Sequence, residues 1–138
     1  MTVGMFEKQH IVDFLFTHLD QYGDKKEDII KCADYALNTG NHPGGVILSA
    51  WDDDKIIGAT IINHTGMGGF IPENILVYIA THQDYRGKGI GKTLIEAAFR
   101  ETNGDIALHV EPDNPAKLLY EKLGFTNKYL EMRWKRPS

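Results

Sequence analysis

The chain contains, from residue 85 to residue 93, the glycine-rich stretch Tyr85-Arg86-Gly87-Lys88-Gly89-Ile90-Gly91-Lys92-Thr93. It stands between an almost continuous apolar run, Ile75 to Thr81, and a segment with helical spacing, Gly89 to Asn103. Glycines at alternate positions let the backbone adopt positive φ angles and approach a ligand closely. The free N–H groups and the dipole of a helix that begins here favour an anion. We therefore interpret the stretch as a cradle for a diphosphate, with a purely structural strand-to-helix turn as the alternative.

Two familiar phosphate motifs do not fit this stretch. The phosphate loop of nucleotide hydrolases, G-x-x-x-x-G-K-[ST], would require a glycine where Arg86 stands. The dinucleotide fingerprint G-x-G-x-x-G fails because Gly87, Gly89 and Gly91 are spaced two and two. The basic side chains of Arg86, Lys88 and Lys92 still favour an anionic ligand.

Working outward, apolar periodicity and turn residues predict the other elements. Helices are expected at 6–19, from a start at Asp24 and Glu27 to residue 37, at 89–103 and from Asn114-Pro115 to Gly124, and strands at 46–51, 56–63, 75–81, 106–110 and 125–134. The strand at 75–81 is apolar enough to be covered on both faces. The resulting order, α-α-β-β-β-α-β-α-β, predicts an α/β (α+β) protein with a mixed sheet and helices on both faces.

Two segments resemble one family. Arg86-Gly87-Lys88-Gly89-Ile90-Gly91 matches R-x-x-G-x-G, and Asn114-Pro115-Ala116-Lys117-Leu118-Leu119-Tyr120-Glu121-Lys122-Leu123-Gly124-Phe125 matches a helix with a tyrosine that closes in Leu-Gly-Phe. In this order they resemble the GCN5-related N-acetyltransferases (GNAT), over Trp51 to about Trp134. The resemblance implies a mostly antiparallel central sheet. The family's first strand would be degenerate, because only Thr2 to Phe6 precede the first helix.

The resemblance also implies a cofactor site for acetyl-CoA. The pantetheine arm would pair with the strand edge at Ile79, Ala80 and Thr81. The pyrophosphate would take the backbone N–H groups of Gly87, Lys88, Gly89, Ile90, Gly91 and Lys92. Arg86 would open this loop, and Asn114 would contact the cofactor from the second motif, with Asp113 as the alternative because the spacing from Asn114 to Tyr120 is one residue short.

The same resemblance suggests catalytic roles. Tyr120 would be the general acid that protonates the leaving thiolate, and the alternative is a tyrosine that packs on the core with its hydroxyl in water. Glu73, thirteen positions before Arg86, is a candidate general base, and a solvated charge at a strand start is the alternative. Glu111 and His109 are further candidates for the base.

Length and composition limit the number of domains and the classes of ligand and partner. A chain of 138 residues with a net charge of −4 suits a single domain, 1–138, and lacks the basic excess of a nucleic-acid-binding protein. The single Cys32 excludes an internal disulfide and a multi-cysteine zinc site. We read the acids at 52–54 as a turn and expect no metal. No apolar run is long enough for a membrane span, so we expect a cytoplasmic protein without membrane partners.

We therefore expect an acetyl-CoA-dependent N-acetyltransferase that modifies a primary amine of a small molecule or peptide. The alternatives are a non-catalytic acetyl-CoA-binding or sensing domain and a nucleotide-phosphate binder. The short end of the chain after Phe125 leaves room for a homodimer in which a neighbouring copy completes the acceptor site.

Overall fold

The computed structural model describes residues 5–38 and 41–138, which divide into two compact units, residues 1–108 and residues 109–138. Each unit is described by itself. A single domain over 1–138 therefore stays a prediction.

A four-stranded sheet organises the first unit. Its strands are β1 (Gly45–Asp52), β2 (Lys55–His64), β3 (Asn74–Thr81) and β4 (Ile106–Leu108), in the spatial order β1-β2-β3-β4. The pairs β1–β2 and β2–β3 are antiparallel, whereas β3 and β4 run parallel. The mixed, mostly antiparallel sheet expected from the sequence is confirmed.

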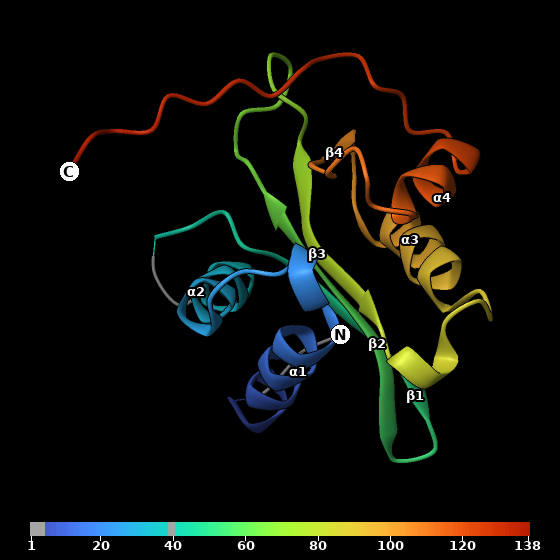
Figure 1. The fold of residues 1–138 in the computed structure, drawn as a ribbon. Helices are drawn as coiled ribbons and strands as arrows, with labels where there is room; N and C mark the ends of the chain where they lie inside the picture. Colours follow the sequence, from blue (N-terminus) through green and yellow to red (C-terminus); the bar gives the residue numbers. More distant parts are fainter. Residues whose placement is uncertain (1–4, 39–40) are drawn as a thin grey trace. The chain divides into compact units, whose positions relative to one another are not determined.

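Helices cover both faces of this sheet (Figure 1). On one face lie α1 (Met5–His18) and α2 (Lys26–Ala36), and on the other lies α3 (Ile90–Glu101). Neighbouring residues of β2 show the division, because successive side chains of a strand point to opposite faces. Ala59 belongs to the core formed with α1 and α2, whereas a Cβ on Gly58 would lie 2.7 Å from the Ile90 side chain of α3.

The expectation that β3 is covered on both faces is only partly met. Tyr78 and Ala80 are buried in the core with α1 and α2, but Val77 is 37% exposed. The register with β2 explains its position: Ile61 pairs with Tyr78 and Ile62 with Leu76. Val77 is therefore the extra residue of a β-bulge, which bends a strand and interrupts its regular alternation.

The start of α2 differs from the sequence prediction. Lys25 is the N-cap residue, and no side chain caps the helix. The Asp24 carboxylate, expected as the cap, instead accepts a hydrogen bond from the Tyr78 hydroxyl at 2.5 Å. The degenerate first strand falls mostly on residues 1–4, outside the described residues, and α1 begins at Met5.

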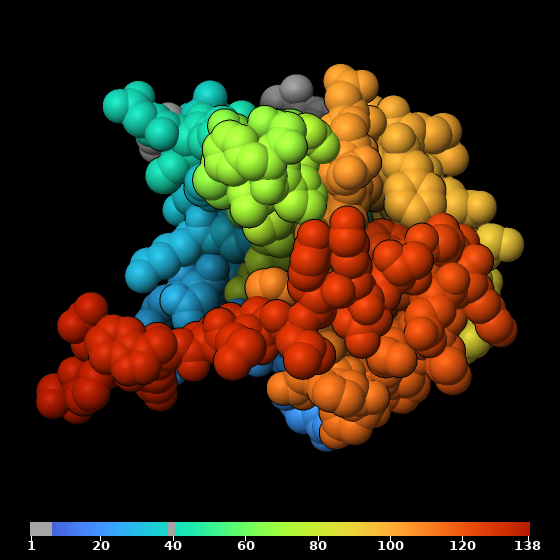
Figure 2. All heavy atoms as spheres, turned by 90° about the horizontal axis from the view of Figure 1, so that it is seen from above, coloured from blue at the N-terminus to red at the C-terminus, as the bar shows by residue number. Residues whose placement is uncertain are grey.

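The loop between β2 and β3 lies beside the loop between α3 and β4. Figure 2 shows the first as a projecting yellow-green group of atoms, with orange atoms next to it. Hydrogen bonds at the start of β3 hold the loops together, among them the bond from the Asn74 N–H to the Asp105 carbonyl at 3.1 Å and the bond from the Asp105 N–H to the Glu73 carboxylate at 2.8 Å. They form one end of the sheet, opposite the glycine-rich loop.

The second unit contains the helix α4 (Ala116–Lys122) and an extended chain after it. The final strand predicted at 125–134 is wrong, because this segment forms neither strand nor helix. Strand residues need a neighbouring strand to satisfy their N–H and C=O groups, and no strand pairs with this segment in the described chain. No helix among the described residues is long and apolar enough to cross a membrane.

Candidate active site

The edge of β3 is open on the β4 side. β4 pairs with β3 only from Asn74 to Leu76. Beyond the bulge at Val77, no strand in the described part of residues 5–108 pairs with this edge, although β2 continues to pair with the other edge as far as Thr81. Ile79, Ala80 and Thr81, the residues predicted to receive an extended ligand, therefore have an unpaired edge in this unit.

The glycine-rich loop follows directly after this edge. A short 3-10 helix, η2 (Gln83–Tyr85), leads to Gly87 and Gly89, whose φ angles are 78° and 82°. Gly89 is the N-cap residue of α3 in the left-handed conformation, which a side chain disfavours. A Cβ at Gly87 or Gly89 would meet nothing within 4 Å. The glycines are thus required for backbone conformation, and the space beside them is open.

The amides of this loop are free. The first backbone hydrogen bond of α3 joins the Thr93 N–H to the Gly89 carbonyl at 3.0 Å. In the described chain, no N–H from Gly87 to Lys92 donates to a protein acceptor. Together with the dipole of α3, six such amides make an anion site. Lys88 and Lys92 are exposed beside it, and the Lys88 ammonium also lies 5.2 Å from the centre of the Tyr85 ring.

The Arg86 side chain binds residues at and just after the end of α1. Its guanidinium forms an ion pair with the Asp20 carboxylate at 3.0 Å and donates to the His18 carbonyl at 3.0 Å. The charge that the sequence offers to a phosphate is therefore neutralised by the segment that follows α1.

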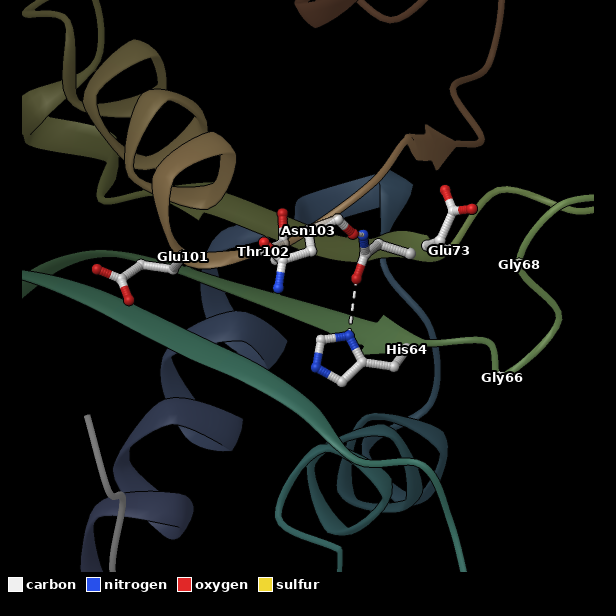
Figure 3. A pocket seen from close by; sticks show the side chains of 8 residues that line it. His64, Gly66, Gly68, Glu73, Glu101, Thr102 and Asn103 are labelled. Carbon is white, nitrogen blue, oxygen red and sulfur yellow. Dashed lines mark hydrogen bonds between the residues drawn. The ribbon is translucent and has the colours of Figure 1, made fainter.

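Glu73 lies at the opposite end of β3 from the glycine-rich loop. It borders a groove of about 350 Å³, with His64 and Glu101 on the same groove (Figure 3). Hydrogen bonds from the N–H groups of Asp105, at 2.8 Å, and Gly69, at 3.3 Å, lower the pKa of the Glu73 carboxyl, with the bond from Asp105 the larger cause. Glu73 is thus ionised, but one of its oxygens joins the β2–β3 loop to the α3–β4 loop and the other holds the β2–β3 loop itself.

The groove is lined on its inner side by Asn74, which is 1% exposed. Its amide nitrogen donates to the carbonyls of Asn103 and Asp105. Its oxygen lies 2.7 Å from Nδ1 of His64, as the dashed line in Figure 3 marks. Because the Asn74 oxygen can only accept, the hydrogen bond requires a proton on His64 Nδ1.

In the second unit, Tyr120 is buried, and its ring lies edge-on to that of Phe125 at 5.8 Å. Burial raises the pKa of the Tyr120 phenol. Its hydroxyl has no hydrogen-bond partner within residues 109–138. The Asn114 side chain accepts from the Ala116 N–H at 2.9 Å and so stabilises the first turn of α4.

A family profile described as an acetyltransferase (GNAT) domain matches residues 43–127. The chain belongs to the GNAT acetyltransferase family. The matched range includes the open strand edge, the glycine-rich loop and α4.

Among curated GNAT relatives, mycothiol acetyltransferase of Geodermatophilus obscurus is 31% identical over 103 residues, 68% of this chain and 32% of that protein. N-alpha-acetyltransferase 30 of Schizosaccharomyces pombe is 35% identical over 81 residues, 55% of this chain and 54% of that protein. The chain thus spans about a third of the length of the first relative and about half of the second.

Solved structures share the GNAT fold. Aminoglycoside N-acetyltransferase AAC(6')-Iy in complex with CoA has a TM-score of 0.73 at 17% identity, covering 99% of this chain and 92% of that chain. A transcriptional regulator from Bacillus halodurans C-125 has a TM-score of 0.69 at 18% identity, covering 99% and 97%. At these identities the likeness concerns the fold.

Sequence reasoning missed two contacts of this GNAT domain. One joins Asp20 to Arg86, and the other joins Asp24 to Tyr78, which follows the bulge. Their partners are 66 and 54 residues apart in the chain. No local pattern signals such pairs, because helix and strand periodicities relate residues only a few positions apart.

Proposed function

We propose that this chain is an acetyl-CoA-dependent N-acetyltransferase that transfers the acetyl group by direct attack of an amine on the thioester. The observation that carries the proposal is the run of free amides from Gly87 to Lys92 at the start of α3. It suits a diphosphate, and it follows an open strand edge that suits the amide groups of a pantetheine arm. Membership of the GNAT family supports the same cofactor.

The cofactor would lie along this part of the first unit. Its diphosphate would bind the amides of residues 87–92, and its pantetheine would pair with Ile79, Ala80 and Thr81. The arm would then run towards the bulge at Val77, beyond which β4 closes the edge. Backbone N–H groups at this edge would stabilise the oxyanion that develops on the thioester oxygen.

The reaction forms a bond between the amine nitrogen and the carbonyl carbon and breaks the bond from carbon to sulfur. The attacking amine loses a proton to a base, and the departing thiolate gains one. We assign the second proton to the Tyr120 hydroxyl, whose raised pKa keeps the phenol protonated at neutral pH. Asn114, or Asp113, would contact the cofactor.

Fewer observations support the choice of general base than that of general acid. We propose Glu73, and Glu111 and His109 are the alternatives. Glu73 precedes Val77 by four positions, about 13 Å of extended strand, so we propose that it acts through intervening water. If so, Glu73→Gln lowers kcat by about 10²-fold or more, whereas Glu101→Gln, on the same groove, does not. A lower melting temperature with unchanged kcat would instead assign Glu73 to holding the loops.

We propose a primary amine of a small molecule or peptide as the acceptor. Relatives named mycothiol acetyltransferase and N-alpha-acetyltransferase support this breadth, and a structural neighbour is named for aminoglycosides. A cationic amine would suit the exposed acids Asp24, Glu27 and Asp28 around the start of α2.

The experiment that tests the proposal has two parts. In thermal unfolding, saturating acetyl-CoA should stabilise the chain, by roughly 3 kcal/mol at a hundred times the dissociation constant, and ATP should not. A panel of primary amines, including kanamycin and an N-terminal peptide, should then release CoA thiol. Stabilisation by ATP but not by acetyl-CoA would contradict the cofactor, and binding without thiol release from any amine would favour the sensing domain.

A further inference from the structure

Asp20, the first residue of the 3-10 helix η1 (Asp20–Tyr22), has a left-handed backbone with φ of 55°. Only a few per cent of non-glycine residues adopt positive φ, and surrounding contacts usually maintain such a conformation. Within residues 5–38 and 41–138, only Asn38 and Asp53 share this feature with Asp20. The contacts of the Asp20 side chain suggest what this conformation serves.

The Asp20 carboxylate binds both ends of the segment that leads from β3 to the glycine-rich loop. Oδ1 accepts from the Gln83 amide at 3.3 Å, and Oδ2 accepts from the Arg86 guanidinium at 3.0 Å. The guanidinium also donates to the His18 carbonyl at 3.0 Å. Asp20, which follows α1, and His18, the last residue of α1, thus fix the segment that directly precedes the free amides.

Neighbouring contacts fix the same segment. The His18 ring lies on the His82 ring, with centres 4.3 Å apart, and His82 Nδ1 accepts from the Asp84 N–H at 3.1 Å. From the β1–β2 hairpin, the Asp52 carboxylate accepts from the Tyr85 hydroxyl at 2.6 Å. Asp20 therefore belongs to a set of contacts that orders residues 82–86 from two directions.

We propose that Asp20 is a positioning residue for the diphosphate of the cofactor, acting through Arg86. Arg86 serves as a strut, that is, a side chain that fixes the glycine-rich loop against the end of α1. The Asp20 carboxylate neutralises its charge. The diphosphate is bound by the amides of 87–92, together with Lys88 and Lys92. This inference rests on the proposed function, and it changes the role that the sequence suggested for Arg86.

The two roles of Arg86 make opposite predictions for the loss of Asp20. If Arg86 were a phosphate ligand, removing its carboxylate partner would free the guanidinium and strengthen acetyl-CoA binding. If Arg86 is a strut, the same change disorders the loop and weakens binding. The pair is exposed, at 50% for Arg86 and 41% for Asp20, so its loss should leave the fold intact.

The test compares Asp20→Gly with Asp20→Asn. Glycine keeps the left-handed backbone without the carboxylate, whereas asparagine tolerates this backbone and still offers an oxygen to Arg86. We expect Asp20→Gly to raise the Kd for acetyl-CoA about tenfold, and Asp20→Asn to stay within about threefold of the parent. Asp53→Gly is the matched control, because it makes the same change at another exposed aspartate with φ of 55°.

Hydrogen–deuterium exchange without cofactor supplies an independent readout, and Asp20→Gly should speed exchange of the amides at 83–92. Unchanged exchange would overturn the strut, and unchanged or tighter acetyl-CoA binding would overturn its role in positioning. If the parent itself fails to bind acetyl-CoA, the proposed function fails and the positioning role fails with it. The exchange measurement would still report whether Asp20 orders the loop.

Discussion

At the residue scale, the hydrogen bond between Tyr78 and Asp24 joins the strand after its bulge to the loop before α2. Tyr78 is 7% exposed. Burial and the neighbouring Asp24 carboxylate, in that order, raise the pKa of the Tyr78 phenol far above its usual value. A phenol that donates to a carboxylate forms one of the stronger classes of hydrogen bond, so this contact holds the loop before α2 against β3.

We expect Tyr78→Phe to lower the free energy of unfolding by about 1–2 kcal/mol, measured by urea denaturation at pH 7. The pH dependence follows from the sign of the shift. Because the folded state holds the phenol proton more tightly than the unfolded state, this stabilisation is present below pH about 10, the ordinary tyrosine value, and is lost at higher pH.

The Tyr78→Phe variant should therefore lose less stability than the parent between pH 9 and pH 11. Tyr35→Phe is the matched control, because its hydroxyl donates to the His64 carbonyl at 2.7 Å rather than to a carboxylate. An alkaline loss in Tyr78→Phe as large as that of the parent would contradict the assignment.

Tyr120 supports a second prediction at this scale. If its hydroxyl protonates the thiolate, Tyr120→Phe lowers kcat by about 10²-fold or more and leaves the Kd for acetyl-CoA within about twofold. Steady-state thiol release and calorimetry measure the two constants. Phe125→Leu, which alters the ring packed against Tyr120 but keeps its hydroxyl, is the control. Equal kcat values in Tyr120→Phe and the parent would remove Tyr120 from the mechanism.

At the scale of elements, the bulge at Val77 and the short pairing between β3 and β4 shape the proposed cofactor site. The parallel pairing with β4 stops at Leu76 and leaves the rest of β3 open, and the bulge bends β3 where the pairing stops. The glycine-rich loop then turns the chain into α3 with its amides free. Strand edge and helix start are consecutive in sequence, so one connection sets the geometry of both halves of the proposed cofactor site.

Substitutions at two glycines of this connection distinguish an effect on the stability of the fold from an effect on acetyl-CoA binding. Gly89 has positive φ, whereas Gly91 lies in α3 with ordinary helical geometry. Gly89→Ala should destabilise the fold by about 1 kcal/mol and weaken acetyl-CoA binding. Gly91→Ala should leave the melting temperature unchanged or higher but weaken binding about tenfold, because the methyl group occupies the approach of the diphosphate. Unimpaired binding in Gly91→Ala would contradict this path for the ligand.

At the scale of the whole molecule, the segment after α4 has a strand-like pattern, and no strand among the described residues pairs with it. Leu130, Met132 and Trp134 alternate with Glu131 and Arg133, and these two charged residues form an ion pair at 2.5 Å. Alternate residues of an extended chain share a side, so the segment has one apolar and one charged side.

Such a segment gains stability by joining a sheet edge, and we propose that it does so in a homodimer. Light scattering at working concentration should give twice the mass of 15.6 kDa, and removal of residues 126–138 should return the monomer. A monomeric mass for the whole chain would count against the dimer.

The sequence by itself determined most of the element order, the hairpin of β1 and β2, the glycine-rich turn into α3 and the family. These features depend on residues close together in the chain: apolar periodicity, glycines at positive φ, and the Asn-Pro start before α4. The candidate residues from Ile79 to Lys92 were identifiable because strand edge and loop are consecutive.

Tertiary structure alone decided the rest. It assigned Arg86 to Asp20 and Asp24 to Tyr78, because a charged or polar side chain takes whichever partner folding brings near, however distant in sequence. It also engaged Glu73 with two amides, since the loops that flank β3 and β4 meet at that point. The strand expected at 125–134 failed for the same reason: a strand exists only when another strand supplies its hydrogen bonds, and periodicity within one segment cannot specify that partner.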